Sequence, residues 1–335
     1  MRRTLKPLPL TGLLVIAAFT AKTAHAETTG SHQGMVISCP MYGKVWGSSA
    51  MSQAIQEVKA LGVNKIQIHP YARIHKDGRI TFTPTSERAY LRRAVKIAEQ
   101  NSVDLFWKPH LAYWGSFDWR GAITFSSEAE WQRFFRTYEA WILDHARFAQ
   151  EHQIKLFAVG TELDKTIHRP EWSTLIKKVK AVYSGTLVYA ANWDSYARVP
   201  FWREIDLIGI QAYFPLSSTN AAVTRASLDA QWKRIYSELE TFSKTHKRKI
   251  LFTELGYTRS TLAASEPWAS KNHGPKDEAL ALQKMLLTTA LETIKRHDFV
   301  IGAYLWKWMP GFAPWERDFS MRDKDVRNAI QKVWK

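Results

Sequence analysis

The sequence contains a single cysteine, Cys39, among 335 residues, so an intrachain disulfide is impossible. Cys39 lies in an apolar run, which predicts an inert buried thiol rather than a nucleophile. No segment after the N-terminal region is long and apolar enough to cross a bilayer, which needs about 20 residues. We therefore predict no transmembrane segment.

Several catalytic signatures are also missing. There is no Gly-x-Ser-x-Gly elbow, which argues against a serine hydrolase of the α/β type. His69, His75 and His110 are scattered and form neither a His-Glu-x-x-His motif nor a His-x-His pair on a strand. We predict neither a metal nor another cofactor.

The N-terminus has the pattern of a secretory signal. Basic residues precede an apolar run over residues 8–19, and an Ala-His-Ala triplet follows that ends at Ala26. The apolar run is too short for a membrane anchor. We predict a signal at 1–26, cleaved after Ala26, a short segment at 27–34, and a secreted or periplasmic enzyme domain at 35–335.

The chain is strongly basic, with a formal net charge of +16. The predicted signal carries four of these positive charges and no acid, which leaves +12 on the mature chain. Such an excess attracts polyanions, including an anionic cell-wall polymer, although a generally basic surface explains it equally well. No lysine or arginine block typical of basic tails is present, and nucleic-acid binding would depend on charge alone, so we predict none.

β-rich segments alternate with segments of helical periodicity along the mature chain. One helix is predicted from a capping box formed by Ser127 and Glu130, followed by apolar residues that fall on one face. The β-rich segments occupy residues 36–43, 65–72, 104–112, 156–163, 187–193, 207–215, 250–257 and 301–308.

Eight apolar strands separated by helices predict a single (β/α)8 TIM barrel with elaborated loops after strands 3, 7 and 8. A doubly wound open sheet is the alternative. It would be favoured by a glycine-rich phosphate turn after the first strand, and "YGKVWGSS" lacks the required spacing.

Two glutamates occupy unusual positions in this pattern. Glu254 interrupts the strand "KILFTELGY", where an isolated carboxylate would be costly to bury. Glu162 ends the fourth strand, as Glu254 ends the seventh. Barrel enzymes place their sites at these C-terminal ends, so we expect both carboxylates to face one polar cleft.

Two carboxylates that flank one bond are the requirement of glycoside hydrolysis. In a retaining enzyme they lie about 5–5.5 Å apart, one as nucleophile and one as acid/base. Their environments must differ, so that one pKa is raised. Lys108, His110 and Tyr213, which also end strands, are candidate sources of that difference.

The predicted loops are rich in tryptophan, whose face suits the apolar face of a sugar ring. Trp114 is a predicted substrate contact. Packing of these loops onto the barrel is the alternative role for each side chain. The loop tryptophans are Trp114, Trp119, Trp268, Trp308 and Trp315.

The motifs "VGTEL" and "FTELGY" resemble the strand 4 and strand 7 ends of the clan of retaining (β/α)8 glycoside hydrolases. With "WKPHL", "ANWD" and "YFP", the chain is most similar to glycoside hydrolase family 113, known for endo-β-1,4-mannanase activity. The resemblance covers nearly the whole mature chain. It implies a polysaccharide substrate and no cofactor.

The resemblance also implies roles for individual residues. Glu162 would be the acid/base, Glu254 the nucleophile, and Tyr213 would orient that nucleophile. Trp306 would form the floor of the subsite for the attacked sugar. Contacts to the same sugar would come from Lys108, His110, Asn192 and Trp193.

One departure from the clan pattern concerns the residue before the acid/base. The clan commonly has asparagine there, whereas this chain has Thr161, so a different group would supply the usual hydrogen bond to the sugar 2-hydroxyl.

The substrate is open at this point. The resemblance favours mannan, whereas the basic mature chain also fits a muramidase-like hydrolase of peptidoglycan that uses the same glutamates. An inactive glycan-binding barrel is a further alternative.

Overall fold

The computed structural model describes residues 31–335 except 40, 219–221, 271–272 and 312–318. The predicted secretory signal and Trp315 lie outside the described residues.

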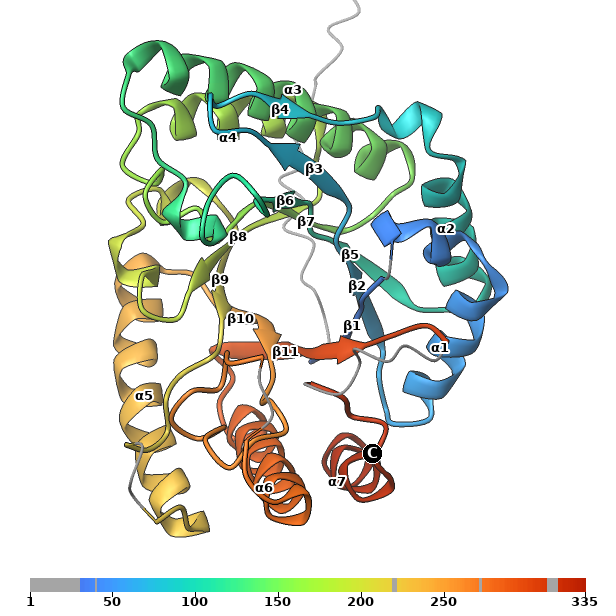
Figure 1. Ribbon diagram of the computed structural model, residues 1–335, viewed down its shortest axis with the longest axis vertical. Helices are drawn as coiled ribbons and strands as arrows, with labels where there is room; N and C mark the ends of the chain where they lie inside the picture. The colour runs from blue at the N-terminus through green and yellow to red at the C-terminus, as the bar shows by residue number, and fades with distance from the viewer. Residues whose placement is uncertain (1–30, 40, 219–221, 271–272, 312–318) are drawn as a thin grey trace, which may run out of the picture.

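Eight parallel strands form a closed ring with helices outside it, which confirms the predicted (β/α)8 barrel (Figure 1). β1 pairs with both β2 and β11, so the first and last strands close the barrel. The strands are β1 (His32–Ile37), β2 (Lys65–Ile68), β5 (Asp104–Trp107), β7 (Leu156–Thr161), β8 (Thr186–Asn192), β9 (Leu207–Gln211), β10 (Ile250–Leu255) and β11 (Val300–Trp308).

The first strand begins and ends earlier than predicted. β1 starts at His32, so residues 32–34, which were assigned to the segment before the barrel, belong to its wall. Cys39 follows the strand and is partly buried. Burial raises the pKa of its thiol to about 12, as expected for an unreactive cysteine.

Amphipathic helices cover the outside of the ring (Figure 1). The capping box before α3 is present: Ser127 and Glu130 exchange side-chain to backbone hydrogen bonds. The apolar face of α3 packs into the layer between helices and barrel. The helices are α1 (Ser49–Lys59), α2 (Ala89–Gln100), α3 (Glu128–Glu151), α4 (Glu171–Val182), α5 (Arg225–His246), α6 (Lys276–Lys295) and α7 (Lys324–Trp334). Short 3-10 helices are η1 (Met41–Gly47), η2 (Thr85–Glu87), η3 (Arg120–Ala122), η4 (Tyr196–Arg198) and η5 (Trp202–Glu204).

A second, three-stranded sheet lies beside the barrel rim, in the order β4–β3–β6. Its strands are β3 (Tyr71–Ile74), β4 (Ile80–Thr81) and β6 (His110–Ala112). The predicted strands at 65–72 and 104–112 are each split in two. Pro70 and Pro109 stand at the breaks, where a missing N–H cannot continue the ladder of the barrel.

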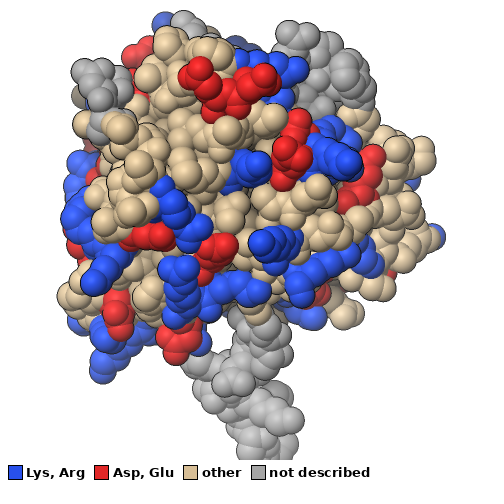
Figure 2. Space-filling model, turned by 90° about the horizontal axis from the view of Figure 1, so that it is seen from below, with Lys and Arg blue, Asp and Glu red and all other residues tan. Residues whose placement is uncertain are grey.

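Basic side chains are spread over the surface and mixed with acidic ones. Figure 2 shows Lys and Arg mainly over the lower half of one face, with Asp and Glu among them. Two ion pairs on α5, Arg234 with Glu238 and Lys244 with Glu240, illustrate this mixing. Among the described residues, no helix has the length and apolar character needed to span a bilayer.

Candidate active site

A cavity of about 590 Å³ opens at the C-terminal ends of the barrel strands. Eight of the nine predicted site residues line it; Lys108 is the exception, because it lies fully buried beneath. The eight residues are His110, Trp114, Glu162, Asn192, Trp193, Tyr213, Glu254 and Trp306.

Glu254 is held by hydrogen bonds to both carboxylate oxygens. Lys108 Nζ donates to Oε1 at 2.6 Å, and the Tyr213 hydroxyl donates to Oε2 at 2.8 Å. Only 4% of the residue is exposed. Its position in an apolar strand is therefore explained by two partners. The ionic partner, Lys108, follows β5 on the opposite side of the ring, and the hydroxyl donor, Tyr213, follows the neighbouring strand β9.

The second contact of the Lys108 ammonium is the side chain of Gln211, whose Oε1 lies at 2.9 Å. Burial lowers the pKa of Lys108, and the charge of Glu254 acts in the opposite direction. His110 Nε2 lies 3.9 Å from Glu254 Oε1. Burial holds the pKa of His110 well below its usual value, so the ring is neutral at pH 7.

Glu162 follows β7 directly and has a left-handed backbone, with φ of 51°. Arg120 Nη1 donates to Oε2 at 2.5 Å, and Gln211 Nε2 donates to Oε1 at 3.4 Å. Burial raises the pKa of Glu162, the Arg120 guanidinium lowers it, and the nearby Glu254 charge raises it further, with an upward shift as the net result.

Gln211 connects the two glutamates. Its amide nitrogen contacts Glu162, while its oxygen accepts from Lys108, which in turn donates to Glu254. The glutamine is also fixed by Thr253, whose hydroxyl donates to Oε1 at 2.8 Å. The two predicted carboxylates thus belong to one hydrogen-bonded group.

Arg120 and Gln211 were not among the predicted site residues. Gln211 ends a strand, and this position at a strand end is the sequence feature that could have identified it as a site residue. Arg120 lies on the loop after the third barrel strand, where its Nε donates to the carbonyl of Leu111 at 3.2 Å. Only the folded loop brings this guanidinium to Glu162, so sequence spacing gave no signal for it.

Aromatic side chains form much of the cavity wall. Trp193 and Trp268 stack at 5.6 Å between ring centroids with 13° between planes, and Trp114 and Trp268 are 54% and 48% exposed. Trp119 lines the cavity as well. Trp308 corrects the expectation for the loops, because it is buried and donates to Glu57 Oε2 at 3.0 Å.

Trp306 lines the cavity and packs against the buried ring of His69 at 5.6 Å. The Asn192 amide donates to Asp194 at 3.0 Å, and Asp194 is the third carboxylate that borders the same space. Thr161 is buried, and its hydroxyl makes no hydrogen bond within the part of the chain that the structure describes. No cluster of three His, Cys, Asp or Glu suited to a metal occurs among the described residues.

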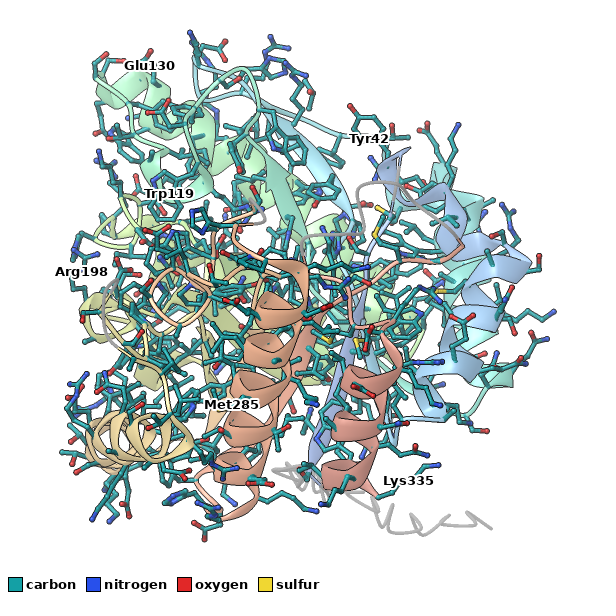
Figure 3. All side chains as sticks on the ribbon, turned by 60° about the horizontal axis from the view of Figure 1, so that its bottom comes forward. Tyr42, Trp119, Glu130, Arg198, Met285 and Lys335 are labelled. Atoms are coloured by element: carbon teal, nitrogen blue, oxygen red, sulfur yellow. The ribbon has the colours of Figure 1, made fainter. Side chains whose placement is uncertain are left out.

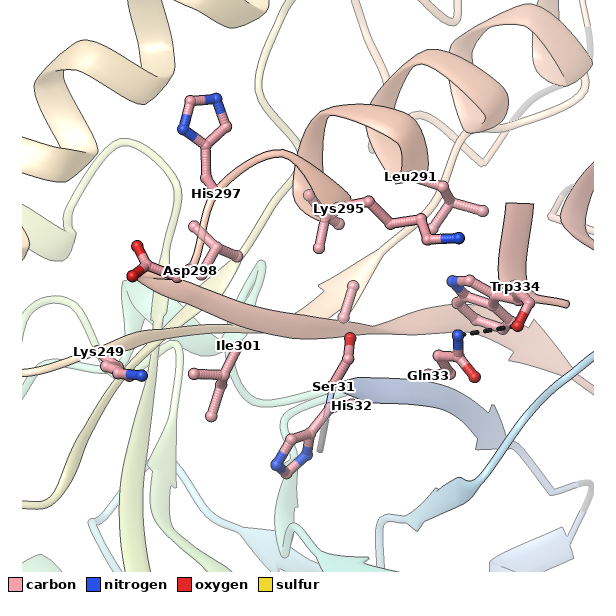
Figure 4. Close-up of a pocket in the computed structure, with 13 residues that line it drawn as sticks. Ser31, His32, Gln33, Lys249, Leu291, Lys295, His297, Asp298, Ile301 and Trp334 are labelled. Carbon is pink, nitrogen blue, oxygen red and sulfur yellow. Dashed lines mark hydrogen bonds between the residues drawn. The ribbon is translucent and has the colours of Figure 1, made fainter. Parts of the chain in front are cut away.

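A different cavity of about 360 Å³ lies at the opposite end of the barrel (Figure 4). Ser31, His32 and Ile301 border it near the starts of β1 and β11. Figure 3 shows Trp119 and Tyr42 toward one end of the molecule and Lys335 toward the other. Barrel enzymes act at the C-terminal face, so the cavity around the two glutamates is the candidate active site.

Comparison with solved structures shows a shared fold. A β-1,4-mannanase of family 113 has a TM-score of 0.80 at 17% identity, covering 91% of this chain and 99% of that chain. The β-mannanase from Alicyclobacillus acidocaldarius has a TM-score of 0.77 at 20% identity, covering 92% and 98%. A β-glucuronidase from Faecalibacterium prausnitzii has a TM-score of 0.60 at 10% identity, covering 90% and 48%.

A search of curated proteins gave no match. The sequence matches the family model described as Glycoside Hydrolase Family 113 over residues 41–332. Because the match spans most of the chain, the protein belongs to glycoside hydrolase family 113 and is a glycoside hydrolase.

Proposed function

We propose that the protein is an exported, retaining and endo-acting hydrolase of β-1,4-linked polysaccharide of the mannan type. The observation that carries the mechanism is the contrast between two carboxylates in one cavity. Glu254 accepts hydrogen bonds from Lys108 and Tyr213, whereas the pKa of Glu162 is raised by burial. Mannan as the substrate is supported by the family and by the names of its solved relatives.

In the first step, the Glu254 carboxylate attacks the anomeric carbon of the sugar. Glu162 in its protonated form donates its proton to the leaving glycosidic oxygen. Lys108 and Tyr213 hold Glu254 in one orientation, because both of its oxygens are engaged. The products of this step are a covalent glycosyl-enzyme and a released chain end.

In the second step, Glu162, now ionised, accepts a proton from a water molecule that attacks the anomeric carbon. The bond from sugar to Glu254 breaks, and the product keeps the β configuration. Arg120 beside Glu162 stabilises the ionised form that exists between the two steps. Trp306, Asn192, Trp193 and His110 are proposed to contact the sugar from the cavity wall.

Stereochemistry provides the direct test. Proton NMR of mannan oligosaccharide hydrolysis should show the β anomer first, with the α anomer appearing only through mutarotation. Initial formation of the α anomer would contradict the retaining mechanism.

Substitution tests the two glutamates separately. Glu254→Gln should abolish turnover, and Glu162→Gln should lower kcat by about 10²–10⁴-fold for substrates that need leaving-group protonation. Glu99→Gln, on the exposed face of α2, is the matched control and should leave kcat unchanged. Azide should restore activity to a Glu254→Ala variant and give the α-azide; an active Glu254→Gln enzyme would contradict the nucleophile assignment.

Export is tested on the full chain. N-terminal sequencing of the protein collected outside the cytoplasm should give a chain that begins after Ala26, and an uncleaved chain retained in the cytoplasm would contradict this part of the proposal.

A further inference from the structure

A smaller hollow of about 300 Å³ adjoins the candidate active site, and we name it the annex. Two side chains, Tyr71 and Trp114, line both spaces, with 5.5 Å between their ring centroids. The annex lies over the β4–β3–β6 sheet and reaches Tyr42 of η1. The two spaces therefore meet at Tyr71 and Trp114.

The two spaces differ in charge. The active-site cavity is lined by three carboxylates, those of Glu162, Asp194 and Glu254, and by one guanidinium, that of Arg120, which is paired with Glu162. The annex is lined by two guanidinium groups, Arg73 and Arg88, and by no carboxylate. A neutral sugar would gain nothing from this charge, whereas a negatively charged one would be attracted.

Arg73 is the guanidinium available to a ligand. Its side chain is exposed and makes no hydrogen bond or ion pair within the described part of the chain. Arg88, in contrast, already donates to the carbonyl of Tyr71 at 3.3 Å. The planar fork of an arginine matches a carboxylate with two parallel hydrogen bonds.

The position of Arg73 on β3 places its side chain on the face that lines the annex. Arg73 pairs with Thr81 of β4 on one side and Ala112 of β6 on the other, so the middle strand fixes its position. Alternate residues of a strand share a face, which places Arg73 beside Tyr71. Arg73 and Tyr71 thus both line the annex.

Aromatic faces complete the annex. Tyr42 is 71% exposed and Trp114 is 54% exposed, and both line it. Figure 3 shows Tyr42, which belongs to η1, in the upper part of the molecule. Such exposed rings suit the apolar face of a pyranose, while Arg73 is placed to bind a charged substituent at the edge of the sugar ring.

We propose that the annex is a subsite for a carboxylate-bearing sugar, with Arg73 as its anion-binding residue. This inference rests on the proposed glycan hydrolase function, and it names the substrate class as a glycan that carries acidic sugars near the cleaved bond. The carboxylate can come from a uronic acid or from the lactyl ether of a muramic acid, and the binding chemistry is shared.

Paired substrates test the proposal on the full mature protein. β-1,4-Mannan and the same mannan partly oxidised at C6 differ only in carboxylates. At low salt, the wild type should favour the oxidised polymer by about fivefold in kcat/KM, and Arg73→Gln should remove that preference while retaining activity on neutral mannan. Arg147→Gln, an exposed arginine in the C-terminal half of α3, is the matched control and should keep the preference.

Binding is measured separately, so that failure of the proposed function can be recognised. Affinity electrophoresis of Glu254→Gln uses gels that contain oxidised mannan or glycan strands of peptidoglycan. Retardation of the protein in these gels measures glycan binding at the annex in the absence of turnover. Loss of retardation in Glu254→Gln/Arg73→Gln supports the inference, and the gel that shows it identifies the source of the carboxylate. Equal retardation with and without Arg73 overturns the inference, whereas absent turnover on every mannan overturns only the proposed function.

Discussion

Arg120 contacts the proposed acid/base, Glu162, directly and changes its pKa. Its positive charge lowers the pKa of Glu162, so Arg120→Gln should raise that pKa further. A general acid with a higher pKa stays protonated to higher pH. We therefore expect the alkaline limb of the kcat/KM profile to move to higher pH in this variant, together with a loss of kcat from the second step.

The pH profile distinguishes this effect from simple damage to the loop, because disorder would lower activity at every pH without moving the limb. Arg147→Gln removes the same charge far along α3 and should leave the profile in place. A limb that moves to lower pH in Arg120→Gln would contradict the assignment of Glu162.

Lys108 contributes to the stability of the fold as well as to the chemistry of the site. It is fully buried against Glu254, which is itself 4% exposed. Removal of one partner leaves a buried charge uncompensated, so Lys108→Met should lower the free energy of unfolding by about 3–5 kcal/mol. The double variant Lys108→Met/Glu254→Gln should recover much of this loss in urea denaturation. A double variant as unstable as the single one would assign the loss to packing.

At the scale of elements, the loops after the strands determine how much of the glycan is held. Trp268, on the loop after β10, stacks on Trp193 and is half exposed in the cavity. Trp268→Ala removes a contact made equally in the ground and transition states, so KM should rise while kcat changes little. Steady-state kinetics on oligosaccharides of increasing length will check this. A fall in kcat at unchanged KM would contradict a role in binding.

The β4–β3–β6 sheet is the element that the sequence pattern obscured. Residues 65–72 and 104–112 each read as one apolar strand, because a barrel strand and its continuation have the same composition. The prolines at 70 and 109 end the barrel pairing, and His110 then donates its N–H to the carbonyl of Pro70 at 2.9 Å. This change of partner creates the surface on which the proposed annex lies.

At the scale of the whole molecule, α7 packs outside the barrel beside the first strand. The side chain of Gln33 in β1 donates to the carbonyl of Trp334 at 3.0 Å. Removal of residues 324–335 would delete four buried side chains and uncover the surface that they cover. The lost burial is worth about 1.5–3 kcal/mol for each side chain, a total comparable with the whole stability of a domain. The buried side chains of α7 are Val326, Ile330, Val333 and Trp334.

We expect this truncated chain to lose its cooperative thermal unfolding transition in calorimetry. Removal of Lys335 alone, which is exposed, is the control and should leave Tm unchanged. A truncated chain with a sharp transition near the Tm of the full chain would show that the barrel is stable without α7.

The sequence by itself determined the eight strands, the single barrel and the positions of both glutamates, because strand periodicity and residue identity at strand ends are local properties. It also placed Lys108 and Tyr213 at strand ends, and the structure shows both hydrogen-bonded to Glu254. Only the tertiary structure decided the pairing of Arg120 with Glu162, the burial of Trp308 and the charge of the annex. Those features depend on which loop folds over which strand, and contacts between residues far apart in the chain leave no periodic signal.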